Sequence, residues 1–559
     1  MQYKFSSNLQ VNKTLNEVVN TISTMAEDQL KHIQQLTKIG QSLSSETDLD
    51  KIFDMILDEG VAFTKADGAT IYKVNDDVTA LEFEIVYNAT LKTRQGGSHG
   101  SVAWPPVPLY DPDGKPNLSH IVSAVFHKKQ SLIFDDVYQA EGYDISGTIN
   151  FDKNNQYRCK AMLTIPLKDH EDSVLGVIQF INPIDDEGNV STFTAEHRAM
   201  LSSLASQAAI ALSNRKLVGS LENLLLEFMR SIAGAIERKS KYSSAHITRV
   251  ARLTDMIAAE INRSSQGHFA ETKFGENELK EISMAGWMHD VGKIITPEFV
   301  MDKSTKLERI MDGFELILER ISRVMLLLKY LKLSLDKESY RSFVRENFPP
   351  AMHSDPGAYL EDSIDFIQKL NIGAEFVSDE DITRMNEIAQ LNFSCEGNHY
   401  YILDETDVQN LSIRRGTLNN EELKIMRAHA SVTWEMLSQL SFPKKYKNVA
   451  FYAATHHEAL NGKGYPKGLD ESQLPLQSRM IAVADIFEAL TSADRPYKTP
   501  KTLSESLSIM ANMVKFGHLD ANLVDFFMDS GLYLDFANDY MNKDQIDEVD
   551  VAKIKSVYR

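Results

Sequence analysis

The chain of 559 residues is poor in cysteine, with only Cys159 and Cys395. Two cysteines cannot form the disulfide framework that stabilises many small secreted domains, so we expect a reducing, cytoplasmic location. No segment approaches the roughly 18 consecutive apolar residues that a membrane helix needs. The N-terminus MQYKFSSNLQ also lacks a basic stretch followed by an apolar one. The sequence therefore predicts neither a membrane span nor a signal peptide.

The chain is also short of basic residues, because 59 Lys and Arg face 79 Asp and Glu, for a formal charge of −20. Binding a polymer of phosphates needs a basic surface, which excludes a nucleic-acid polymer as the main partner. A small anionic ligand is still compatible with this composition where positive charge is concentrated locally. The proportions of hydrophobic residues (43%) and charged residues (25%) are those of globular protein, and the length predicts more than one domain.

The N-terminal part alternates between helical and strand patterns. Apolar residues at helical spacing predict an N-terminal helix over residues 1–33. Asp48 or Asp50 is expected to cap a following helix. That helix should bury one face, made of Ile52, Phe53, Ile56 and Leu57. Short β-rich runs follow at 69–74, 81–86, 131–135, 161–166 and 174–182. Helices before and after short strands predict an α+β domain with an antiparallel sheet.

A long apolar seam begins after the last strand-like run. Its members are Leu201, Leu204, Ala208, Ile210, Ala211, Leu217, Leu221, Leu225 and Phe228. We expect a long connecting helix over residues 198–235. Such a seam between two domains is typical of a parallel dimer stalk, so we expect a homodimer. The alternative is one long helix packed on its own domain.

The remainder, from about residue 225, reads as helices. Residues 304–413 contain no recognisable catalytic constellation, and we interpret them as a helical insertion. Residues 541–559 are expected to be a C-terminal tail.

Three short phrases place His and Asp on otherwise apolar segments. They are GWMHDVGKI with His289, Asp290 and Lys293; ATHHE with His456 and His457, followed by NGKGYP; and AVADIFE with Asp485. One such residue alone is most often a satisfied buried polar group. Three phrases in one helical domain favour a metal site, because burying an aspartate is costly unless a cation pairs with it. Two successive histidines on a helix point about 100° apart and can therefore serve two adjacent metals.

The ligand types indicate the kind of metal. Nitrogen and carboxylate ligands without cysteine suit Mn, Fe or Zn better than a structural thiolate site. Two such ions suit an anionic phosphodiester, because together they activate a water molecule and neutralise the developing charge.

The phrases HDVGK, HHEALNGKGYPKGL and DRPYK (494–498) resemble the HD-GYP subfamily of the HD metal-dependent phosphohydrolases. The resemblance implies an all-α HD-GYP domain over residues 225–540, apart from the insertion. Members with this pattern hydrolyse bacterial cyclic dinucleotides, chiefly cyclic di-GMP. The implied function is hydrolysis of cyclic di-GMP to linear pGpG, with GMP as the product of a second cut.

The resemblance also implies roles for individual residues. The implied metal ligands are His246, His289, Asp290, His429, His456, His457 and Asp485, with Asp290 as the bridge between two divalent transition metals, Fe or Mn. Asp290 and Lys293 are the implied catalytic residues, and Lys293 would orient or protonate near the phosphate. Members with a third metal place a glutamate four residues before the position of His246. Tyr242 stands there, which favours two metals and leaves His246 as a ligand or a substrate contact.

Substrate binding is implied for Lys463, Gly464, Tyr465, Arg479, Arg495 and Lys498. Gly462 and Gly464 flank a lysine and would allow the backbone to approach a ligand. Arg495 and Lys498 resemble the phosphate grips of the family. The chain departs from the family after HDVGK, where VMDKSTKLE replaces a KPGKL-like phrase before the insertion, but no expected ligand is lost.

Residues 34–214 resemble a GAF sensor domain through CKAMLTIPLKD, SVLGVIQFINPIDDEG and STFTAEHRAMLSSLASQAAIAL. The pattern of the cyclic-nucleotide-binding members is degraded, because Pro183 follows Asn182 and His197-Arg198 replace an acidic pair. A cyclic nucleotide, an unknown small ligand, or no ligand with a dimerising role are all compatible. Cys159 suggests either a redox sensor or, more commonly, a small core residue.

Several functions share this sequence pattern. The first is a cyclic di-GMP phosphodiesterase regulated by its GAF domain through the connecting helix. The second is a 3′,3′-cyclic GMP-AMP phosphodiesterase of the same fold, since both substrates contain two phosphodiesters. The third is a non-catalytic cyclic-dinucleotide-binding module, which loss of a ligand would favour. A nucleotide phosphohydrolase of the wider HD superfamily is disfavoured by the GYP phrase.

Overall fold

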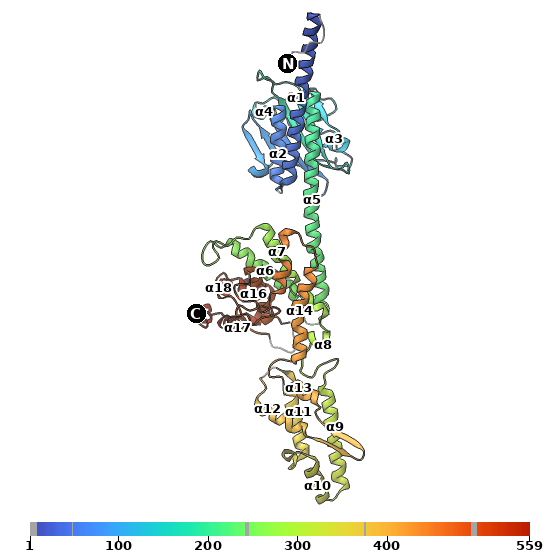
Figure 1. The fold of residues 1–559 in the computed structure, drawn as a ribbon, viewed down its shortest axis with the longest axis vertical. Coiled ribbons are helices and arrows are strands. Elements are labelled where there is room, and N and C mark those ends of the chain that lie inside the picture. The colour runs from blue at the N-terminus through green and yellow to red at the C-terminus, as the bar shows by residue number, and fades with distance from the viewer. Residues whose placement is uncertain (1–7, 47, 241–244, 374–375, 494–499) are drawn as a thin grey trace. The chain divides into compact units, whose positions relative to one another are not determined.

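The computed structural model describes residues 8–46, 48–240, 245–373, 376–493 and 500–559. It divides into two compact units, which meet in the sequence between Leu224 and Leu225 (Figure 1). The first unit is α+β and the second is almost entirely helical, as predicted. No helix in the described ranges has the length and apolar character needed to cross a membrane.

The first unit is built on one antiparallel sheet in the order β3-β2-β1-β7-β6-β5, with β4 paired to β2. The strands are β1 (Ala66–Val74), β2 (Ala80–Asn88), β3 (Thr93–Gly96), β4 (Val107–Pro108), β5 (Leu132–Phe134), β6 (Met162–Lys168) and β7 (Val174–Pro183). All five predicted strand runs are confirmed. The sequence did not indicate β3 and β4, because strands of four and two residues are too short to show alternation.

Helices cover the sheet. They are α1 (Leu9–Ser45), α2 (Leu49–Thr64), α3 (Ile121–Lys128), α4 (Ser146–Asn155) and the start of α5 (Ala195–Glu237). The side chain of Asp48 accepts a hydrogen bond from the Asp50 amide and caps α2, which confirms the predicted cap. Parts of α1, α2 and α5 lie side by side and form one core with the sheet (Figure 1).

The ends of the long helices do not coincide with the predicted domain limits. The helix α1 continues to Ser45, so the predicted limit between residues 33 and 34 falls inside it. In α5, the seam residues Leu201, Leu204 and Ala208 are buried in the core of their own unit, as the alternative interpretation expects. The later seam residues Leu217, Leu221 and Phe228 are exposed. Whether they pair with a second copy stays a prediction.

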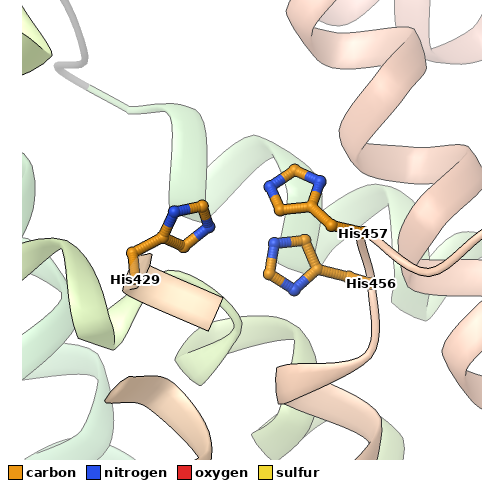
Figure 2. Close-up of side chains that lie close together, drawn as sticks. All are labelled: His429, His456 and His457. Atoms are coloured by element: carbon orange, nitrogen blue, oxygen red, sulfur yellow. The ribbon is translucent and has the colours of Figure 1, made fainter. Parts of the chain in front are cut away.

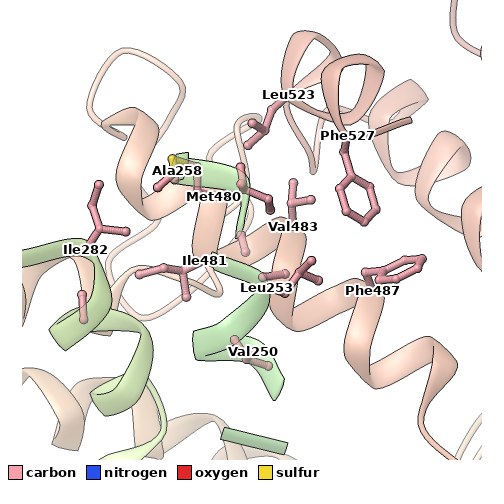
Figure 3. Close-up of a cluster of buried hydrophobic side chains, with 14 of the residues drawn as sticks. Val250, Leu253, Ala258, Ile282, Met480, Ile481, Val483, Phe487, Leu523 and Phe527 are labelled. Atoms are coloured by element: carbon pink, nitrogen blue, oxygen red, sulfur yellow. The ribbon is translucent and has the colours of Figure 1, made fainter. Parts of the chain in front are cut away.

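The second unit carries its main core on helices before and after the insertion. These are α6 (His246–Arg263), α7 (Glu276–Met288), the 3-10 helix η3 (Val291–Ile295), α8 (Glu298–Met301), α14 (Asn420–Ser438), α15 (Val449–Ala454), α16 (Leu476–Thr491), α17 (Leu503–Lys515), α18 (Ala521–Asp529) and α19 (Leu532–Tyr540). Figure 3 shows the centre of this core, where Val250 and Leu253 of α6 lie near Ile481, Val483 and Phe487 of α16. Helix α16 therefore carries polar side chains into a buried environment.

The insertion forms a separate hydrophobic cluster in this unit. Its helices are α9 (Phe314–Ser334), α10 (Lys337–Asn347), α11 (Pro356–Ile372), α12 (Asp379–Ala389) and α13 (Glu405–Leu411). The insertion is not wholly helical, because β8 (Asn392–Cys395) and β9 (Asn398–Tyr401) form a hairpin. Glu396 and Gly397 have positive φ angles in its turn, and Phe393 stacks on Tyr400. Alternating aromatic residues around a glycine turn were the signal that the helical interpretation overlooked.

Residues 541–559 are not a detached tail. They contain α20 (Val551–Lys555), and Ile554 is part of the main core. The side-chain amide of Gln545 donates to the carbonyls of Thr491 and Lys501, and the Tyr558 hydroxyl donates to Asp525. The helical unit therefore extends beyond the predicted limit at residue 540.

Candidate metal centre

Five local segments bring the predicted ligands to one place. His289 follows α7, Asp290 directly precedes η3, and His246 is the first residue of α6. The other ligands lie further along the chain, with His429 in α14, His456 and His457 just after α15, and Asp485 in α16. Segments separated by more than two hundred residues thus meet around Asp290.

Three of the histidines are oriented in the same way. The Nδ1 atoms of His289, His429 and His456 lie 2.8, 2.5 and 2.6 Å from the backbone carbonyl three residues earlier in the chain. Donation from Nδ1–H to that carbonyl fixes the tautomer and leaves Nε2 with a lone pair. Each histidine therefore presents Nε2 to the centre.

The carboxylate of Asp290 lies between two groups of nitrogen atoms. Its Oδ1 is 3.5 Å from His429 Nε2 and 3.9 Å from His456 Nε2. Its Oδ2 is 3.2 Å from His289 Nε2 and 3.3 Å from His246 Nε2. Two sets of three side chains, His429–His456–His457 and His246–His289–Asp290, each have ligand atoms within 4.8 Å of one another. Figure 2 shows the three rings of the first set facing one another.

The residues fit a bound cation. The Nε2 atoms of His289, His429 and His456 and the Oδ1 atom of Asp290 are buried and have no hydrogen-bond partner. Buried polar atoms are normally paired, and leaving four of them unpaired in one place would be costly. Coordination of a metal ion would satisfy all four, so the donor set itself supports a metal site.

A second acidic group borders His246. Its Nε2 lies 3.2 Å from Asp485 Oδ1, and its Nδ1 is hydrogen-bonded to Glu488. The other oxygen of Glu488 accepts a hydrogen bond of 2.5 Å from Arg249 Nε. The sequence analysis assigned no role to Glu488 or Arg249. The spacing of Asp485 and Glu488, three residues apart on one helix face, was the available signal.

Burial and charge set the protonation of the centre. Burial lowers the pKa of His429, His456 and His457, in the last case to about 4, so all three imidazoles are neutral near pH 7. Burial alone would raise the pKa of Asp290, but Lys293 and His289 hold it well below its usual value. The carboxylates around His246 overcome the effect of burial and raise the pKa of that imidazole. Neutral imidazoles and ionised carboxylates are the ligand forms that metals require, so His246 would have to release a proton to bind a metal, whereas His429, His456, His457 and Asp290 already have the required form.

Gly292 allows η3 to pack against α14. A Cβ atom at this position would lie 2.0 Å from the carbonyl oxygen of His429. The hydroxyl of Thr433 joins the same two segments, because it donates to the carbonyl of His289 and accepts from the amide of Gly292. The glycine of the HDVGK phrase therefore has a steric role that the sequence analysis did not assign.

We expect Gly292→Ala to destabilise the second unit by about 2–3 kcal/mol, because the added methyl group forces η3 away from His429. Metal content should fall as well, since both segments carry ligands. Thermal unfolding and elemental analysis measure the two effects. Gly234→Ala is the matched control, because its Cβ would meet no atom within 4 Å. Equal stability of both variants would contradict the packing role.

The segment NGKGYP forms a loop beside His457. The ring of Tyr465 lies 4.8 Å from the ring of His457, between ring centres, and burial raises the pKa of the Tyr465 hydroxyl, which therefore stays protonated. The carboxylate of Glu458 accepts hydrogen bonds from the amides of Lys467 (2.6 Å) and Leu469 (2.9 Å). A Cβ on Gly464 would lie 2.3 Å from the amide nitrogen of Ala459. The close approach at this glycine is to the chain's own backbone, a reason that the sequence did not indicate, and its role toward a ligand stays a prediction.

The other predicted substrate residues differ in their surroundings. Lys463 is exposed in the loop. The guanidinium of Arg479 is bonded to Asp520 at 2.8 Å and to the carbonyls of Leu474 and Glu471, so its groups are already engaged within the protein. Arg495 and Lys498 lie outside the described residues, as does Tyr242, on which the expectation of two metals rests. The substrate roles of Lys463, Arg479, Arg495 and Lys498 stay predictions.

Arg427 was missed by the sequence analysis. It lies on α14, two residues before His429, and its guanidinium is 5.3 Å from the ring centre of Tyr465. Within the described ranges, no carboxylate forms an ion pair with it, and its side chain is exposed. An exposed arginine beside the aromatic ring that neighbours His457 is suited to an anionic ligand.

Asn182 and Cys159, the two residues of the GAF-like unit for which a ligand or redox role was considered, both lie in the protein interior. Asn182 is buried, its side-chain oxygen accepts from the amides of Lys160 and Ala161, and its amide group donates to Arg158 and Tyr157. Its hydrogen-bonding groups are therefore used within the protein. The thiol of Cys159 is buried, and burial raises its pKa to about 12, which is expected of a core residue.

Comparison with known proteins agrees with this division. The GAF domain family matches residues 48–212, and the HD domain family matches residues 406–523, starting near the end of the insertion. A 3′3′-cGAMP-specific phosphodiesterase 1 of Vibrio cholerae is 40% identical over 110 residues, which are 20% of this chain and 25% of the relative. A cyclic di-GMP phosphodiesterase of Thermotoga maritima is 42% identical over 94 residues, 17% of this chain and 25% of the relative.

These alignments span only a quarter of the length of each relative. Among solved structures, the GAF domain from an Acinetobacter phosphoenolpyruvate-protein phosphotransferase matches 34% of this chain and 98% of its own length, with 15% identity and a TM-score of 0.24. On the family matches, this chain carries a GAF domain at residues 48–212 and an HD domain match at residues 406–523.

Proposed function

We propose that this chain is a metal-dependent phosphodiesterase that hydrolyses a cyclic dinucleotide, with cyclic di-GMP as the substrate and linear pGpG as the first product. The observation that supports it most is the position of Asp290, whose two carboxylate oxygens face two separate groups of histidines. This arrangement suits two neighbouring divalent ions that share one carboxylate. The names of the relatives support the substrate class.

His429, His456 and His457 would hold one ion, His246 and His289 the other, and Asp290 would bridge them, with Asp485 beside His246 and His457. When bound, two ions of the Fe or Mn type activate water and neutralise charge on a phosphate. The donor set contains nitrogen and carboxylate oxygen without thiolate, which fits either metal.

Lys293 and Tyr465 would act on the substrate itself. The Nζ atom of Lys293 lies 2.6 Å from Asp290 Oδ2, and its side chain is partly exposed. It is therefore placed to orient Asp290 and to donate a hydrogen bond to a phosphate oxygen or the leaving oxygen. Tyr465 offers a flat ring beside His457, with a protonated hydroxyl that can donate.

The second candidate substrate is 3′,3′-cyclic GMP-AMP. It is favoured by the Vibrio cholerae relative, whose name states that specificity. Both substrates present two phosphodiesters to the same centre, so the metal-site geometry serves either. A non-catalytic binding module is disfavoured, because the full set of predicted ligands comes together.

Product analysis tests the proposal. Purified full-length chain, loaded with Mn²⁺ or Fe²⁺, is incubated separately with cyclic di-GMP, 3′,3′-cyclic GMP-AMP and a linear dinucleotide, and the products are separated by chromatography. Ring opening of cyclic di-GMP with slower cleavage of the linear product is the expected result. Faster cleavage of 3′,3′-cyclic GMP-AMP would select the second candidate, and cleavage of neither would refute the proposal.

Arg427→Ala is expected to raise the KM for the cyclic dinucleotide about tenfold and to leave the metal content unchanged. The reason is the loss of one charge-assisted hydrogen bond to the substrate, which contributes roughly 1.5 kcal/mol. Steady-state kinetics and elemental analysis check this. Lys424→Ala on the same helix is the matched control, because Lys424 is exposed and paired with Glu421. An unaltered KM in Arg427→Ala would show that this guanidinium does not contact substrate.

We also propose that the GAF domain regulates the enzyme within a homodimer and binds a small ligand of unidentified chemistry. On α5, the exposed residues Leu217, Leu221, Leu224 and Phe228 follow the alternating spacing of four and three residues that pairs helices in a coiled coil. The exposed residues Val11, Leu15, Val18, Ile22 and Met25 of α1 repeat the same spacing. A second copy in parallel register would cover both stripes.

A further inference from the structure

The last turn of α5 and the residues just after it contact two segments that carry site residues. The Nζ atom of Lys239 donates to the carbonyl oxygens of Thr296 (2.7 Å), Lys293 (3.4 Å) and Ile294. A carboxylate oxygen of Glu237 accepts a hydrogen bond of 3.1 Å from the amide of Thr248. One short stretch thus reaches both η3 and the start of α6.

The contact of Lys239 fixes the end of η3. An ammonium group has three N–H donors, and here three carbonyls receive them. Carbonyls at the C-terminal end of a helix lack partners within it and carry partial negative charge, so a cation is stabilising there. Because η3 begins directly after Asp290 and contains Lys293, its position determines where both side chains lie.

The contact of Glu237 fixes the start of α6. The first amides of a helix also lack partners, and a carboxylate is favoured beside them. Thr248 is in the first turn of α6, two residues after His246. The imidazole of His246 in turn faces Asp290 and Asp485. Glu237 therefore positions the backbone that carries His246, and Lys239 positions the backbone that carries Asp290.

We propose that Lys239 and Glu237 are positioning residues that set the geometry of one half of the metal centre, the His246–His289–Asp290 group. Neither residue contacts a ligand side chain directly, and both act through the backbone that carries the ligands. The histidines of the other group lie on α14 and just after α15, whereas the hydrogen bonds of Lys239 and Glu237 reach η3, Thr296 and α6. The inference rests on the proposed function only in that the centre binds two metals.

The test is metal binding by the full-length chain, made metal-free and titrated with Mn²⁺ by calorimetry, with bound metal counted by elemental analysis. The wild-type chain should bind two ions. Lys239→Met should keep one affinity and weaken the other about tenfold, as is typical when a group behind metal ligands is removed. Lys239→Arg should retain both affinities, because a guanidinium can also donate to several carbonyls. The neighbouring exposed Arg238→Met is the matched control and should bind as wild type.

Kinetics and a second variant separate positioning from folding. In Lys239→Met, kcat should fall more than KM rises, because Lys239 itself makes no contact with substrate in the proposed site. Glu237→Gln keeps the shape of the side chain and should weaken the same single metal site to a smaller extent. The inference would be overturned if both metal sites were weakened equally and the unfolding temperature fell. It would also be overturned if neither site changed, or if the wild-type chain bound fewer than two ions. Selective loss of one site without any dinucleotide cleavage by the wild type would refute the proposed function and leave the positioning role standing.

Discussion

Asp290→Ala is expected to lose both bound metals and to reduce cyclic-dinucleotide hydrolysis by roughly three orders of magnitude or more, about 4 kcal/mol of transition-state stabilisation. The reason is that each carboxylate oxygen faces a different group of ligands. Alanine leaves His246, His289 and Lys293 without the negative charge that holds them together, so neither group of ligands remains complete. Elemental analysis and turnover on the same preparation measure the two losses.

The control for this variant is Asp255→Asn. Asp255 lies on α6, the helix that begins at His246, and it hydrogen-bonds to Ser283 away from the centre. Burial raises its pKa to about 6, and the uncharged amide of asparagine keeps its shape, so metal content and turnover should be retained. An Asp290→Ala chain with full metal content would place the metal site elsewhere, and one with full activity would exclude this centre from catalysis.

The ligand positions could be predicted because they lie in short phrases. His289, Asp290, His456, His457 and Asp485 are polar residues on apolar segments, which periodicity and burial energetics make conspicuous. The resemblance added His246 and His429. The structure brings all seven together, although they come from five segments of the chain.

The residues behind the ligands could not be predicted in the same way. Glu488 was visible in the sequence beside Asp485, but its partner Arg249 is more than two hundred positions away. Lys239 bonds to backbone carbonyls, which leave no mark on side-chain patterns. Gly292 was part of a recognised phrase, but its steric reason depends on how closely α14 approaches η3.

The same distinction applies to the fold. The longer strands of the GAF-like unit coincide with the short β-rich runs of the sequence, and the predicted antiparallel sheet is confirmed. The hairpin at Asn392–Tyr401 was not predicted, because it lies within a long polar segment that was interpreted as helical. The C-terminal residues form a short, charged segment that the sequence marks only as a tail, and their long-range contacts show that they belong to the core, as when Gln545 bonds to Thr491 and Tyr558 to Asp525. Local patterns predict elements, whereas long-range contacts decide which of them share a core.

Helix α5 offers a direct test of regulation, because it runs without a break from the GAF domain to the last turn that holds Glu237. An insertion after Arg215 rotates everything that follows about the helix axis, by about 100° per residue. Five inserted residues leave a net rotation of about 140°, whereas seven leave only about 20° in the opposite sense. The two insertions therefore differ little in length but strongly in the rotation that they impose about the helix axis.

We expect the five-residue insertion in the full-length chain to lower kcat at least about fivefold, within the roughly 5–150-fold range of allosteric coupling, and the seven-residue insertion to leave it near wild type. In a dimer with paired stripes, rotation forces Leu221 and Phe228 out of the seam unless the end of α5 moves. That end carries the contacts of Glu237 and Lys239 with the segments of His246 and Asp290. Turnover is compared at equal metal content, and sedimentation confirms that both variants are dimers. Equal turnover of the two insertions would show that the GAF domain does not act on the metal centre through this helix.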